Sequence, residues 1–234
     1  LALRYNTSGS QNIAIGYQAL TANTTGQVNI AIGFQSLYQN TTGISNIGLG
    51  LSTLRANISS DYNIALGASS LYDHQYGDGN IAIGYQALLN TEPASVKYNV
   101  AIGAATLKNN FGNYNIALGA SALATNNNIV ADYNIAIGQS ALYNNGSGNK
   151  NIAIGQNSLL SNNSGSLNIA IGYNCASALT SGGNNLAIGV AALSYATTGS
   201  RNIALGVGAG WSISSGTDNI AIGSSVSYQK NGNN

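Results

Sequence analysis

The sequence predicts an all-β fold: a parallel β-solenoid of about thirteen coils that fills residues 1–234 as a single repeat domain. The motif Asn-Ile-Ala-Ile-Gly recurs thirteen times with small variations, and nine of its twelve intervals are 17 residues long. A 17-residue repeat is too short for a pair of helices, but it accommodates two short strands and two turns. The composition agrees, because the chain has 30 Gly and only 6% charged residues.

Each coil is predicted to begin with a strand in which large and small residues alternate. With the Asn of the motif as position 0, positions 1 and 3 are always Ile, Leu or Val, and position 2 is Ala except for Gly48. Side chains alternate between the two faces of a strand, so we expect the large pair to fill the coil and Ala to face outward. Gly at position 4 supplies the first corner. Leu at position 8 lies on a second strand that closes the interior, and the polar positions 10 to 16 form a longer turn.

An outward column of Ala is predicted to be an interface between several parallel solenoids, because small side chains let another backbone approach closely. Replacing Ala136 and Ala153 with Glu is therefore expected to dissociate the assembly. The candidate interface residues are Ala14, Ala31, Ala65, Ala82, Ala101, Ala117, Ala136, Ala153, Ala170, Ala187, Ala204 and Ala221.

The Asn residues at position 0 are predicted to form a structural ladder, in which the side-chain amides of stacked coils hydrogen-bond to one another. These residues are Asn12, Asn29, Asn46, Asn63, Asn80, Asn99, Asn115, Asn134, Asn151, Asn168, Asn185, Asn202 and Asn219.

Few side chains in the sequence are suited to catalysis or metal binding. Solenoid enzymes that hydrolyse sugars use paired carboxylates, and Asp61 and Asp78 share one register in consecutive coils. Lys97 follows them in that register, which favours a partly neutralised surface charge ladder, with a cation site and catalysis as alternatives. His74, beside Asp73, has no second His or Cys in its coil, which argues against a metal site, and Cys175 occupies position 7, where small residues predominate. We therefore predict no catalytic residue, no metal site and no cofactor.

Aromatic residues are the better candidates for surface recognition. Those directly before the Asn of a motif are Tyr62, Tyr98, Tyr114 and Tyr133. Their rings can stack on the outer turn, either as packing between coils or as a platform for sugars. Six Asn-x-Ser/Thr sequons share position 11 of the same predicted turn, where glycans are sterically possible if the protein passes through a eukaryotic secretory route, but turn chemistry without glycans is the favoured interpretation. The Asn residues of the sequons are Asn6, Asn23, Asn40, Asn57, Asn145 and Asn162.

The segment Asn-Ile-Ala-Ile-Gly-Tyr-Gln-Ala-Leu (12–20), followed by Asn-Thr-Thr-Gly (23–26), resembles the repeats of viral and phage tail-fibre-type proteins. This resemblance covers essentially the whole chain. The Ala-Ile-Gly core is more loosely similar to the head repeats of trimeric autotransporter adhesins. That similarity implies a left-handed parallel β-roll that assembles as a homotrimer, and the resemblance brings no catalytic residues with it.

Together these observations predict a non-enzymatic structural protein of an extracellular or virion-surface fibre. It would act as a rigid spacer, and adhesion to a host or other surface is a further role. The alternatives are a self-assembling extracellular filament subunit, a polysaccharide depolymerase and an ice-binding protein. Expected partners are other copies of the chain, with a trimer favoured, more fibre in axial contact, and a surface glycan or receptor. The net charge of +1 argues against nucleic acid as a partner, and the short apolar runs argue against membrane insertion.

Overall fold

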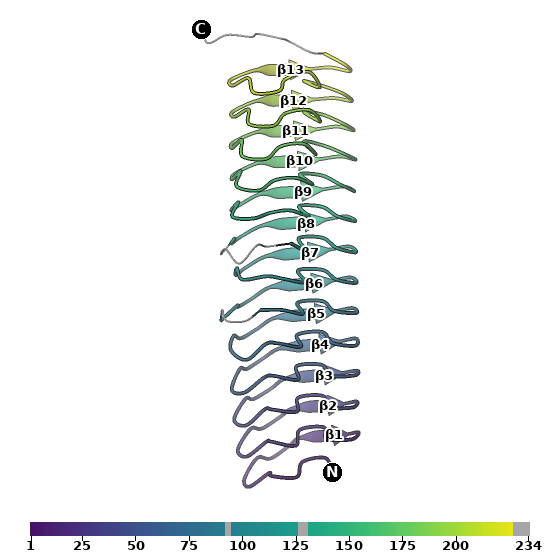
Figure 1. Cartoon of the computed structure of the whole chain (residues 1–234), viewed down its shortest axis with the longest axis vertical. Helices are drawn as coiled ribbons and strands as arrows, with labels where there is room; N and C mark the ends of the chain where they lie inside the picture. Colours follow the sequence, from purple (N-terminus) through teal and green to yellow (C-terminus); the bar gives the residue numbers. More distant parts are fainter. Residues whose placement is uncertain (92–94, 126–130, 227–234) are drawn as a thin grey trace. The chain divides into compact units, whose positions relative to one another are not determined.

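A computed structural model describes residues 1–91, 95–125 and 131–226, which form an all-β parallel solenoid with one three-residue strand per coil (Figure 1). The chain forms two compact units, one covering Leu1–Tyr114 and one that starts at Asn115. The strands of the first unit are β1 (Ile13–Ile15), β2 (Ile30–Ile32), β3 (Ile47–Leu49), β4 (Ile64–Leu66), β5 (Ile81–Ile83) and β6 (Val100–Ile102). Those of the second are β7 (Ile116–Leu118), β8 (Ile135–Ile137), β9 (Ile152–Ile154), β10 (Ile169–Ile171), β11 (Leu186–Ile188), β12 (Ile203–Leu205) and β13 (Ile220–Ile222).

Within each unit, strands that follow one another in sequence are neighbours in a parallel sheet. The pairing keeps the register of the repeat, so that Ala170 of β10 pairs with Ala187 of β11. The register is the same across an interval of 19 residues, where Ala82 of β5 pairs with Ala101 of β6. The two additional residues of that interval are therefore accommodated outside the strands.

The prediction of which strand face points inward is wrong. The Ala residues at position 2 have no exposed surface within the single chain, from Ala31 in β2 to Ala221 in β13, and only Ala14 of β1 is partly exposed. The large residues at positions 1 and 3 are half-buried or exposed instead. The reason is volume, since the buried Leu at position 8 and the inward side chains of the turns leave room only for Ala on the strand side. The Ala column is therefore not a contact surface between subunits, because it has no surface to offer.

The residue at position 8 lies on a run of turns, not on the predicted second strand. Gln18 and Leu20, at positions 6 and 8 of one coil, have left-handed φ values of 57° and 49°, and the pattern recurs along the chain. This conformation costs a residue other than Gly about 1–2 kcal/mol. Burial of Leu20 and hydrogen bonding offset that cost, because its N–H donates to the Ser36 carbonyl of the next coil at 3.0 Å. Hydrogen bonds between turns of successive coils thus stabilise the side of the coil that carries Leu20.

The Gly at position 4 forms a corner that no other residue fits. Gly138, for example, has a φ of +131°, and a Cβ built on it would lie 2.7 Å from the carbonyl carbon of Gly155 in the next coil. The chain therefore turns sharply after each strand, and the residue at position 5 lies beyond the corner. In the described part of the chain, no helix is long and apolar enough to cross a membrane.

Candidate functional site

The Asn residues at position 0 form a hydrogen-bonded ladder along each unit. Asn151 is representative: its Nδ2 donates to Oδ1 of Asn134 at 3.2 Å and to the carbonyl of Gly165 at 2.8 Å. Its Oδ1 accepts hydrogen bonds from the backbone N–H of Asn168 at 3.0 Å and from Nδ2 of Asn168 at 3.2 Å. Because all four capacities of a buried amide are used, these side chains hold coils together and are not free to bind a ligand.

A second ladder, which the sequence analysis missed, is formed by the Asn residues of the sequons. Asn40 is fully buried, and its Nδ2 donates to Oδ1 of Asn23 at 2.9 Å and to the carbonyl of Gly43 at 3.1 Å. Asn23, Asn57, Asn145 and Asn162 are buried in the same way. Glycans do not fit at these five Asn residues, because position 11 points into the coil, whereas Asn6 of the first sequon is exposed. The recurrence of Gly three residues after four of these five Asn residues was the available signal, with Ser60 after Asn57 as the exception.

His74 takes the place of an Asn in this second ladder. The imidazole is fully buried, with Nε2 2.7 Å from the carbonyl of Gly77 and Nδ1 3.1 Å from Oγ1 of Thr91. Burial lowers the pKa of His74 to about 4, although the Gly77 carbonyl and Asp78 favour the charged form. Over the ranges that the structure describes, no three His, Cys, Asp or Glu side chains gather as a metal site requires. His74 therefore acts as a neutral internal residue of the coil.

In the described part of the chain, the second ladder leaves an acceptor without a partner at two places where it is interrupted. Oδ1 of Asn57 and Oδ1 of Asn162 are buried and have no hydrogen-bond partner. The next residues in the register are His74 and Leu179, neither of which places a donor where an Asn amide would lie. A buried acceptor left in this state costs about 1–3 kcal/mol.

We expect His74→Asn to stabilise the protein at neutral pH by about 1–2 kcal/mol, because the new amide can donate to Oδ1 of Asn57. The gain should grow in acid. The pKa of His74 is about 4 in the folded state, against 6.5 for an ordinary imidazole, so the unfolded chain takes up a proton first as the pH falls. The wild type then loses roughly 3 kcal/mol between pH 6.5 and pH 4, a loss that the variant lacks. Urea unfolding of both proteins across this range measures the difference.

The comparison has an internal control, because every other acidic and basic group is common to the two proteins. A stability difference that stays constant from neutral pH to about pH 4 would contradict the buried, neutral state of His74.

Asp61, Asp78 and Lys97 lie in one column, and their side chains bind the neighbouring coil or one another. Oδ1 of Asp61 accepts the N–H of Ile44 at 2.8 Å, and Oδ1 of Asp78 accepts the N–H of Asp61 at 3.0 Å. Lys97 Nζ lies 3.1 Å from Oδ2 of Asp78 in a half-exposed ion pair. Partial burial raises the pKa of Asp78, but the Asp61 N–H and Lys97 together bring it below its usual value. Asp78 is therefore unsuited to donate a proton at neutral pH.

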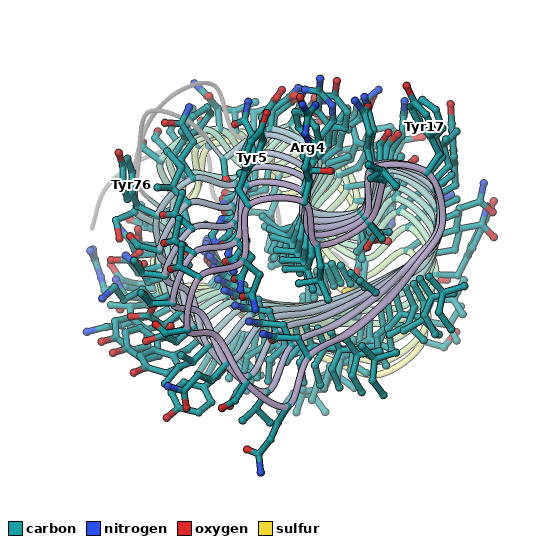
Figure 2. All side chains as sticks on the ribbon, turned by 90° about the horizontal axis from the view of Figure 1, so that it is seen from below. Arg4, Tyr5, Tyr17 and Tyr76 are labelled. Atoms are coloured by element: carbon teal, nitrogen blue, oxygen red, sulfur yellow. The ribbon has the colours of Figure 1, made fainter. Side chains whose placement is uncertain are left out.

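The candidate Tyr residues lie at exposed positions of the turn before the strand. The rings of Tyr98 and Tyr114 stack with their centroids 5.3 Å apart and an interplanar angle of 22°, so each uses one face on the other. Tyr17 and Phe34 stack in the same way at position 5, with centroids 5.5 Å apart. Figure 2 shows Tyr17 pointing outward from the coil, as Tyr5 and Tyr76 do. Stacking along the column favours the packing interpretation, and recognition by these rings stays a prediction.

Tyr133 belongs to the second unit, where it lines a shallow surface groove. The groove crosses three coils and is bordered by Asp132, Tyr133, Asn149, Lys150, Ser166 and Leu167. Two of its polar side chains serve the turns, since Oδ1 of Asn149 accepts the N–H of Asp132 and Oγ of Ser166 accepts the N–H of Asn149. Polar groups already engaged in this way contribute little to binding a ligand.

Cys175 is a buried thiol inside the coil. Its Sγ donates to the carbonyl of Ala187 at 3.3 Å, and burial raises the pKa of the thiol to about 12. At neutral pH the side chain is therefore protonated and shielded, which makes it a poor nucleophile. It fills the space of the small residues that occupy position 7 in other coils.

The outer side of each sheet is an apolar surface that runs along the coils. We call the outward side chains at positions 1 and 3 of the strands in each unit the Ile face. Ile137 and Ile188 on this face keep 37% and 39% of their surface exposed even though a neighbouring coil packs on either side. The sequence analysis placed these residues inside the coil and so did not consider them as a surface.

No family model matches the chain, and no curated protein or solved structure matches it either.

Proposed function

We propose that the protein is a structural component of an extracellular or virion-surface fibre, in which it acts as a rigid spacer. One observation carries the proposal: the buried polar side chains of the coil connect it to the coils before and after it. The Asn at position 0, for example, forms hydrogen bonds both with the coil before it and with the coil after it. A chain whose buried polar groups bond one coil to the next forms a stack of fixed length.

Repeated identical contacts make each unit stiff. Every pair of neighbouring strands in a unit is in the same register, and the backbone hydrogen bonds of the turns recur with it. Bending the stack would lengthen hydrogen bonds on one side of every coil at once. This stiffness suits a spacer, because a spacer must keep a fixed distance between the parts that it joins.

We further propose that several copies of the chain assemble side by side. The resemblance to trimeric adhesin heads supports a left-handed homotrimer, and the exposed apolar surface supports association in general. Adhesion to a host or other surface would then be a property of the assembled fibre, with a surface glycan or receptor as the partner.

The other activities that we considered receive less support from the side chains. For a depolymerase, Asp61 and Asp78 would have to be free in a cleft, yet both accept backbone hydrogen bonds. An ice-binding surface needs a regular array of available Thr hydroxyls. The hydroxyls of Thr24, Thr41 and Thr180 instead donate to carbonyls of the next coil.

The role in a fibre can be tested by immunogold labelling of intact virions or cells of the source, with an antibody raised against the folded chain. We expect gold particles along projecting filaments, at positions accessible without permeabilising the particle or cell. Labelling only after permeabilisation, spread through the interior, would refute the proposed location. Antibody depleted on the purified chain provides the control.

A further inference from the structure

We infer that the Ile face is the surface on which a second copy of this chain packs. The inference names the contact surface of the assembly proposed above, and it rests on that proposal only for the number of copies. It is carried by the constancy of the face within the chain, by its geometry and by its area.

The Ile face is aliphatic in every coil, although its side chains lie outside the core of the single chain. All thirteen coils have Ile, Leu or Val at positions 1 and 3, without a single polar or charged exception. Position 5, also on the outside, instead holds Tyr, Phe, Leu, Ala, Gln, Val or Ser in different coils. An outward position that is free of constraint varies in this way. Two rows of outward positions that are aliphatic in every coil point to a contact that excludes water.

The geometry of the Ile face suits another copy of itself. The rows at positions 1 and 3 run along the stack about 7 Å apart, with the inward Ala between them, so they flank a groove one side chain wide. A row of Ile from a second sheet can enter this groove, with the two sheets about 10 Å apart. The side chains recur once per coil, about every 4.8 Å, and another coil stack has the same period.

The area of the face is that of an interaction surface already within one unit. Three residues across and six or seven strands along give on the order of 300 Å² of projected surface in each unit, and the accessible surface of a ridged face exceeds its projected area. Contiguous apolar patches larger than about a few hundred Å² mark interaction sites on soluble proteins. A soluble monomer seldom leaves an uninterrupted apolar surface of this kind uncovered.

The chemistry of the face selects the same partner. It carries no charge and no hydrogen-bonding side chain, so a charged or polar partner would lose hydration without compensation. A second Ile face is equally uncharged, and its aliphatic rows have matching size.

The test compares two double variants that add the same charge. In Ile137→Glu/Ile188→Glu both substitutions lie on the Ile face of the second unit. In the control, Tyr173→Glu/Val190→Glu, both lie at exposed position 5, beyond the corner Gly. We expect the wild type and the control to sediment as oligomers at micromolar concentration. The Ile-face variant should be a folded monomer, with a dissociation constant raised at least about 100-fold.

A second measurement covers the case in which the charged variant does not fold. Cys175 is buried, so a cysteine introduced by Ile188→Cys is the only reactive thiol, and a short bismaleimide should join two copies through it. The variant Val190→Cys should give little cross-linked product. A monomeric wild type, an Ile-face double variant with unchanged mass, or equal cross-linking at the two sites would overturn the inference. None of these results would affect the immunogold test of location, so the two proposals can fail separately.

Discussion

Ala187→Glu is expected to unfold the coils around it, not merely to dissociate an assembly. Ala187 has no exposed surface and lies on the inward side of β11. A carboxylate placed there is either buried without a partner or protonated in a space sized for a methyl group. Such changes cost more than about 4 kcal/mol, so we expect a large loss of unfolding free energy in urea.

One matched variant and a hydrogen-exchange measurement make the result decisive. Ile188→Glu, one residue further along the same strand, should lose far less unfolding free energy than Ala187→Glu, because its side chain is partly exposed within the chain and the substitution weakens only the contact with a second copy. Hydrogen exchange should accelerate first in β10 to β12 of the Ala187→Glu variant, since each coil contacts only its neighbours. If Ala187→Glu stayed as stable as Ile188→Glu, Ala would face outward, as the sequence analysis expected.

Asn151→Ala should strongly destabilise the second unit, as should the same substitution at other positions of this ladder. It removes a donor to the Gly165 carbonyl and the acceptor for both the N–H and Nδ2 of Asn168, all of them buried. Each orphaned group costs about 1–3 kcal/mol, so we expect a loss of about 3–5 kcal/mol. Urea unfolding followed by circular dichroism measures it.

The control for this substitution is Asn144→Ala, at an exposed position of the neighbouring turn. That change should alter the stability by less than about 0.5 kcal/mol. Equal losses for the two variants would mean that the ladder contributes no more than an ordinary surface amide.

The sequence predicted the repeat architecture well because identical residues at a fixed spacing must stack in register. The Asn at position 0 followed from the same logic, since identical amides above one another can only pair along the stack. The inward face could not be predicted in this way. Alternation in Ile-Ala-Ile separates two faces but does not say which is inside, and the decision rests on the volume that Leu20 and the turns leave in the coil.

The turns were harder to predict for a related reason. Leu20 and Gln18 adopt left-handed backbone conformations that their side chains do not favour, so local propensity pointed to a strand. Asn40 was assigned to the outside because its turn is polar, whereas a polar residue can lie inside if its partner is an identical residue one coil away. In both cases contacts between coils override the preference of the single residue.

The constant register has a consequence for how such a chain can change its length. Ala136, Ala153 and Ala170 pair in succession across β8, β9 and β10, and each meets its neighbour in the same way. Excising one whole 17-residue period around β9 would bring Ala136 opposite Ala170 with every type of contact retained. Loss of a single residue within a strand would instead move Ile into the space of Ala. Recombination between similar repeats of a gene would therefore lengthen or shorten the protein in steps of one whole coil.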